Sequence, residues 1–108
     1  MRLLGPADDS TIVRVTPGEP ITLELPENPG TGFRWHILGI PSCLTVDADD
    51  FIAPGATPPG GGGLRRWAFR ADRAGSGTLR IQLQAPSRRS EPAPPFTLML
   101  DVAGDLPV

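Results

Sequence analysis

Hydrophobic and polar residues alternate with a period of two along most of the chain. Residues 21–25 read Ile-Thr-Leu-Glu-Leu and residues 33–37 read Phe-Arg-Trp-His-Ile, so every second side chain is apolar. Because successive side chains of a β-strand point to opposite faces, this alternation predicts strands with one buried face. In the second segment, Arg34 and His36 are expected on the outer face. Seven strands are predicted in all, at residues 11–15, 21–25, 33–37, 44–47, 66–70, 78–84 and 96–102.

Turn-forming residues separate these strands, and no segment has a convincing helical periodicity. Glycine and proline gather at residues 17–18, 26–32, 41–42, 54–63, 75–77 and 86–95. Short alternating strands with such connections predict an all-β fold, an immunoglobulin-like antiparallel β-sandwich of about seven strands. We expect one domain over residues 1–108, with its core at about 11–102 and short flexible termini. Long loops on a rigid sandwich are common binding sites.

Composition supports a folded domain and excludes several function classes. The 108 residues include 13 Gly and 14 Pro, which alone would permit disorder, but 39% are hydrophobic and the net charge is only −2. The chain is too short for two cores. It has neither the basic patch of a nucleic-acid-binding protein nor the roughly 20 apolar residues that cross a membrane. We therefore expect no nucleic-acid partner and no membrane partner.

Cys43 is the only cysteine and His36 the only histidine. They are the only possible Cys/His nucleophilic pair, but we favour a small, partly buried Cys43 and a solvated His36. One cysteine excludes an internal disulfide and is typical of a reducing compartment. Residues 1–9 lack the apolar stretch of a signal peptide. A cytoplasmic location is expected, or a periplasmic or secreted one if a leader was removed.

Other polar and glycine-rich segments do not match known sites. Asp47, Asp49 and Asp50 lack the spacing of an EF-hand, so a solvated acidic turn is favoured over a calcium site. Gly75-Ser76-Gly77 lacks the strand-to-helix context of a nucleophile elbow and is interpreted as a hairpin turn. Residues 60–63, all glycine, lack the ending of a phosphate-binding loop. We predict no enzyme activity, no catalytic residue, no metal and no cofactor.

The most specific signal is Glu27-Asn28-Pro29-Gly30-Thr31-Gly32-Phe33-Arg34-Trp35, directly after an alternating strand. It resembles the Asn-Pro-Thr-Thr-Gly-aromatic-x-Trp motif of the chagasin-like inhibitors of papain-family cysteine proteases. The order of later features is similar to that family as well: a Gly-rich loop at 59–63, an aromatic strand at 67–71, Gly75 and Gly77, and a last strand from Phe96. The resemblance covers about residues 11–102.

This resemblance implies a monomeric, reversible and competitive inhibitor whose three loops wedge into the active-site cleft of a papain-like cysteine protease without being cut. Thr31 would lie near the catalytic cysteine and histidine of the protease. Pro29 restricts the backbone, and Gly30 and Gly32 permit conformations closed to other residues, so the loop is expected to be preorganised. The implied protease-binding residues are Asn28, Pro29, Gly30, Thr31, Gly32, Phe33, Gly60, Gly61, Gly62, Gly63, Pro86, Ser87 and Arg88.

The third loop departs from the family pattern. Ala85-Pro86-Ser87-Arg88 stands where the family has Arg-Pro-Trp-Glu, and Ser87 cannot supply the large rigid contact of a tryptophan. Gly30 also stands where the family usually has threonine. The alternative is an immunoglobulin-like protein-interaction module that keeps the fold but has lost or changed protease binding.

Structural interpretations of the same segments remain open. Residues 28–32 would then be a simple hairpin connection in which Asn28 caps a turn. The glycines at 60–63 would be a flexible tether, and Arg88 a solvated charge. Trp35, Trp67 and Phe69 are expected in the core, because they fall on inward positions.

Overall fold

The computed structural model describes residues 2–28, 30, 32–53, 63–84 and 94–104. A short 3-10 helix, η1 (Pro6–Asp8), lies between the first two strands. Among the described residues no helix is long and apolar enough to cross a membrane. The strands in chain order are β1 (Arg2–Leu4), β2 (Thr11–Val15), β3 (Pro20–Glu27), β4 (Arg34–Gly39), β5 (Leu44–Ile52), β6 (Gly63–Ala71), β7 (Gly75–Gln84) and β8 (Phe96–Val102).

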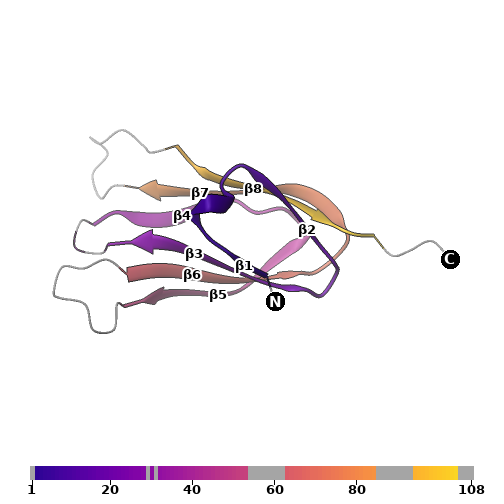
Figure 1. Ribbon diagram of the computed structural model, residues 1–108, viewed down its shortest axis with the longest axis horizontal. Helices are drawn as coiled ribbons and strands as arrows, with labels where there is room; N and C mark the ends of the chain where they lie inside the picture. Colours follow the sequence, from indigo (N-terminus) through magenta and orange to yellow (C-terminus); the bar gives the residue numbers. More distant parts are fainter. Residues whose placement is uncertain (1, 29, 31, 54–62, 85–93, 105–108) are drawn as a thin grey trace.

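These strands form two four-stranded sheets with the orders β1-β3-β6-β5 and β2-β8-β7-β4 (Figure 1). The two sheets confirm the predicted β-sandwich. Pairs in the interior of the sheets are antiparallel, as predicted, but β1 with β3 and β2 with β8 are parallel. The sheets are therefore mixed, because the N-terminal segment adds one edge strand to each of them.

All seven predicted strands are present, and several are longer than predicted. The additional strand, β1, is too short for its alternation to be recognised. The interpretation of residues 75–77 as a hairpin turn is wrong, because β7 begins at Gly75 and the turn lies at residues 72–74. Gly77 is needed for packing instead: a Cβ there would lie 2.5 Å from the Cβ of Pro41.

The core lies between the sheets and confirms most of the predicted faces. Trp67 and Phe69 on β6 are each 1% exposed, and Ile81 on β7 is fully buried. Cys43 is a buried free thiol. Trp35 does not belong to this fully buried set, in contrast to the prediction: it is partly buried and packs against the edge of the core.

Candidate functional site

The strands that flank the three long loops end together at one end of the sandwich, on the left in Figure 1. Cross-strand pairing fixes this arrangement, since Arg34 pairs with Gln84 and Ile52 pairs with Leu64. The sandwich thus places the starts and ends of these loops side by side, as a binding edge requires. The flanking residues are Glu27 and Arg34, Ile52 and Gly63, and Gln84 and Phe96.

The structure describes five of the thirteen predicted protease-binding residues: Asn28, Gly30, Gly32, Phe33 and Gly63. All five lie at the same end of the sandwich. The others lie outside the described residues, namely Pro29, Thr31, Gly60, Gly61, Gly62, Pro86, Ser87 and Arg88.

Asn28 caps a turn at the start of the first loop. Its Oδ1 accepts a hydrogen bond from the backbone N–H of Gly30 at 3.0 Å. Such a side-chain cap replaces a backbone turn bond and restricts the loop before any partner arrives. The structural interpretation of Asn28 is therefore confirmed, and it is compatible with a binding role because a capped loop loses less entropy on binding.

The two glycines of the first loop have different reasons to be glycine. Gly32 has a φ of 80°, in the left-handed region that other residues adopt only at a cost. Gly30 does not have a positive φ, so the expectation that it uses a conformation closed to other residues is wrong. A Cβ at Gly30 would lie 3.2 Å from the Oδ1 of Asn28, a tight contact with the atom that caps the turn.

Gly63 is the first residue of β6, and it is close-packed there. It pairs with Glu27 on one side, and a Cβ on Gly63 would lie 2.5 Å from the carbonyl oxygen of Ile52 on the other. Gly63 therefore belongs to the sheet rather than to a tether. It serves as a rigid base for the second loop.

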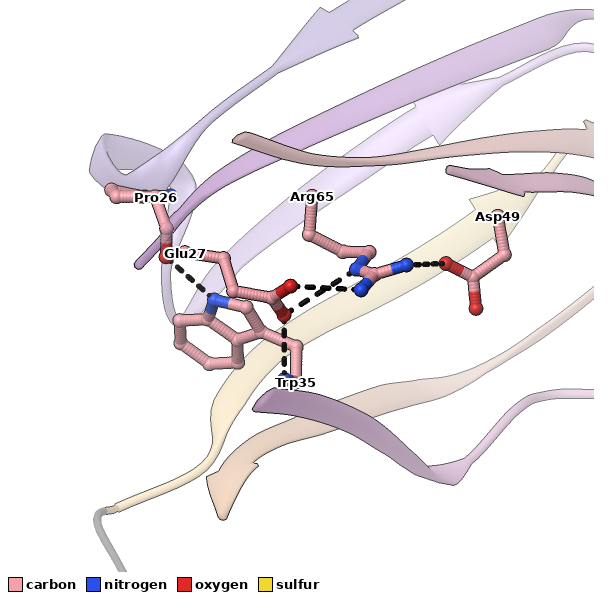
Figure 2. Close-up of polar contacts among 5 residues, drawn as sticks. All are labelled: Pro26, Glu27, Trp35, Asp49 and Arg65. Atoms are coloured by element: carbon pink, nitrogen blue, oxygen red, sulfur yellow. Dashed lines mark hydrogen bonds and ion pairs between the residues drawn. The ribbon is translucent and has the colours of Figure 1, made fainter. Parts of the chain in front are cut away.

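A buried carboxylate ties the two ends of the first loop together. Glu27 is the only buried charged residue among those that the structure describes, with 4% of its surface exposed. Its Oε2 accepts a hydrogen bond from the backbone N–H of Trp35 at 2.9 Å, and the Trp35 indole N–H donates to the Pro26 carbonyl oxygen at 2.7 Å (Figure 2). Because β3 and β4 belong to different sheets, these bonds join the sheets below the loop.

Arg65 on β6 neutralises this carboxylate and extends the network to β5. Its Nη2 donates to Glu27 Oε1 at 2.8 Å and its Nε donates to Glu27 Oε2 at 3.3 Å. Its Nη1 donates to Asp49 Oδ1 at 3.2 Å, and the guanidinium carbon lies 5.9 Å from the centroid of the Phe51 ring. Figure 2 shows these contacts as one chain from Pro26 to Asp49. We call Glu27, Arg65 and Trp35 the loop clasp.

Electrostatics keep the loop clasp ionised. Burial on its own raises the pKa of Glu27, but the hydrogen bonds from Arg65 and from the Trp35 N–H, with the positive charges of Arg65 and Arg34, hold that pKa below its ordinary value. The hydrogen bond to Glu27 raises the pKa of Arg65 further, against the effect of burial, and Asp49 adds to it. The carboxylate is therefore charged at neutral and mildly acidic pH.

The sequence analysis overlooked the loop clasp, although the alternation carried a signal for it. Glu27 is in phase with Leu23 and Leu25, and Arg65 is in phase with Trp67 and Phe69. Both charged residues thus fall on inward positions of their strands. A charge on an inward position requires a buried partner of opposite sign, which is what the structure contains.

The remaining candidates have structural roles. Asp47 and Asp49 lie in β5 rather than in a turn, and they form ion pairs with Arg70 and Arg65 at 3.5 and 3.2 Å. The described part of the chain holds no group of three or more His, Cys, Asp or Glu residues that could bind a metal ion. His36 is exposed on β4, as expected.

Comparisons with known proteins agree with this architecture. The sequence model described as chagasin family peptidase inhibitor I42 matches residues 14–102. No curated protein sequence matches the chain.

Similar folds occur among solved structures. The cysteine protease inhibitor EhICP2 from Entamoeba histolytica superposes with a TM-score of 0.83 at 20% identity, covering 94% of this chain and 95% of that one. Amebosin superposes with a TM-score of 0.74 at 20% identity, covering 95% and 99%. PbICP-C, solved in complex with falcipain-2, superposes with a TM-score of 0.75 at 15% identity, covering 95% and 100%.

Proposed function

The chain belongs to the chagasin family of peptidase inhibitors, and from this we propose that it inhibits papain-family cysteine proteases reversibly and competitively. The observation that best supports this proposal is that the strand ends flanking all three loops meet at one end of the sandwich. PbICP-C, which has a similar fold, was solved in complex with falcipain-2, and this supports a protease as the partner.

The first loop is proposed as the centre of the wedge. Its described part is already fixed by the Asn28 turn and the left-handed Gly32. A preorganised loop pays less conformational entropy on binding, and it resists the rearrangement that cleavage as a substrate would need. Thr31, at the middle of this loop in the sequence, is assigned to the position that faces the catalytic residues of the protease.

Steady-state inhibition of papain tests the proposal. Competitive inhibition requires that the apparent inhibition constant rise linearly with substrate concentration while kcat stays unchanged. Thr31→Arg should abolish inhibition, because a bulky charge at the centre of a desolvated contact cannot be accommodated. Thr78→Arg is the matched control: it makes the same change at an exposed position on β7 and should inhibit like wild type. Equal inhibition by both variants would refute the wedge assignment.

The third loop provides the second test and bears on the alternative function. Ser87 replaces the tryptophan of the family pattern, which favours an interaction module with a different partner. If the protein is an inhibitor, Ser87→Trp should tighten binding to papain, mainly by slowing dissociation, because a rigid indole buries area at low entropy cost. No inhibition by the wild type at high micromolar concentration, against both papain and cathepsin L, would instead support the module.

A further inference from the structure

The loop clasp is costly as a means of stabilisation and well suited to positioning. Taking Glu27 and Arg65 out of water offsets most of their mutual attraction, and apolar residues of similar size are often at least as stabilising. What an apolar pair cannot supply is direction. The carboxylate of Glu27 fixes the start of β4 at Trp35 N and the start of β6 at Arg65, each through hydrogen bonds of defined geometry.

The contacts of the loop clasp lie at the bases of two loops. Glu27 is the last residue of β3 before the first loop. Arg34 is the first residue of β4 after the loop, and Trp35 comes next. Arg65 follows the second loop on β6, and through Asp49 it holds β5, the strand that precedes that loop. One guanidinium therefore ties the end of β3, where the first loop begins, to β5 and β6, the strands that flank the second loop.

We infer that the Glu27–Arg65 pair is a positioning pair for protease binding, which holds the strand ends at the bases of the first and second loops in the arrangement that the protease accepts. This inference rests on the proposed function. The side chain of Glu27 is 2% exposed and that of Arg65 is 19% exposed, so Glu27 acts through the backbone around it rather than by touching the protease. Loss of the pair lowers the fraction of molecules whose loops are correctly arranged, and the apparent affinity falls by that fraction.

The chain contains a matched control pair on the same two strands. Glu24 and Arg66 are cross-strand partners on β3 and β6, with Arg66 Nη2 at 2.6 Å from Glu24 Oε2. Their side chains are 21% and 45% exposed and lie on the outer face of the sheet, away from β4. The two pairs share their chemistry and strands, and they differ in whether they contact the base of the first loop.

The decisive variants replace each pair by apolar residues: Glu27→Leu with Arg65→Met, and Glu24→Leu with Arg66→Met. We expect both to melt close to wild type. The first double variant should raise the inhibition constant for papain by about tenfold or more, which corresponds to a correct loop arrangement in about a tenth of the molecules. The second double variant should leave the inhibition constant unchanged. In surface plasmon resonance the loss should appear in association, with dissociation unchanged, because the final contacts are the same. If the Glu27–Arg65 pair had a purely structural role, an apolar pair that keeps the melting temperature would also keep the affinity for papain.

Each outcome bears on one proposal. If the wild type inhibits papain and the Glu27→Leu, Arg65→Met variant binds papain with equal affinity, the positioning role is overturned and the proposed function stays intact. Absence of wild-type inhibition would overturn the proposed function, and the positioning role in protease binding with it. If the apolar variant fails to fold, Glu27→Gln decides the question, because it keeps the shape of the side chain and removes its charge. An association rate of Glu27→Gln equal to that of wild type would overturn the inference.

Discussion

Replacing Gly63 by alanine is expected to destabilise the protein, because β5 and β6 approach too closely at this point for a side chain. A Cβ on Gly63 would lie 2.5 Å from the Ile52 carbonyl oxygen and 2.5 Å from a carbon of the Phe51 ring. The ring can turn aside, but the carbonyl oxygen belongs to a strand whose register is fixed by pairing. Overpacking of this kind costs about 1–3 kcal/mol. For a chain of 108 residues this lowers the melting temperature by about 4–13 °C.

The matched control is Gly39→Ala. Gly39 also lies in a strand, β4, but no atom would come within 4 Å of its Cβ. This change should leave the melting temperature unchanged or raise it slightly, because alanine restricts the unfolded chain more than glycine does. Thermal melting of both variants, followed by circular dichroism at the same pH and salt, compares them directly. Equal melting temperatures for Gly63→Ala and Gly39→Ala would refute the close approach at the base of the second loop.

The remaining predictions concern the core, the first loop and pH. Ile81→Ala should lower the free energy of unfolding in urea by about 2–5 kcal/mol, whereas Leu38→Ala, at a half-exposed side chain, should change it by less than about 0.5 kcal/mol. Gly32→Ala should cost about 1–2 kcal/mol, because alanine must adopt the left-handed conformation. Since the folded pKa of Glu27 is lowered, its stabilising contribution is complete above the ordinary pKa of an unfolded glutamate and is lost as pH falls through the lower folded value. Stability should therefore fall more steeply for wild type than for Glu27→Gln as acid is added below that pH.

The sequence predicts which face of a strand is buried more reliably than how deeply. The alternation correctly predicted that Trp67, Phe69 and Ile81 are buried, because each lies in the middle of a strand that the opposite sheet covers. Trp35 follows the same pattern but lies on β4, an edge strand of its sheet, where Trp35 and Ile37 are both only partly buried. Depth depends on the place of the strand in its sheet, which a period of two does not encode.

The role of a glycine also depends on contacts that are distant in the sequence. Gly77 looks like part of a turn because Gly75 and Ser76 precede it, yet its neighbour in space is Pro41. The resemblance to a known family locates the first loop from residues 27–35 alone, since the turn and the glycines lie within the motif. It could not reveal Arg65, because the partner of Glu27 comes from a strand almost forty residues later and forms the pair only after the sheet has assembled.

The acidic run on β5 is better understood from its place at the edge of a sheet than from metal chemistry. An edge strand exposes unpaired backbone groups that invite pairing with another chain, and proteins prevent this with charges and bulges. β5 has both, since Asp47, Asp49 and Asp50 are exposed and its pairing register shifts between Val46 and Ala48. β4, the edge of the second sheet, has a similar register shift between Ile37 and Gly39. The edge strands β4 and β5 are thus both protected against the addition of a further strand.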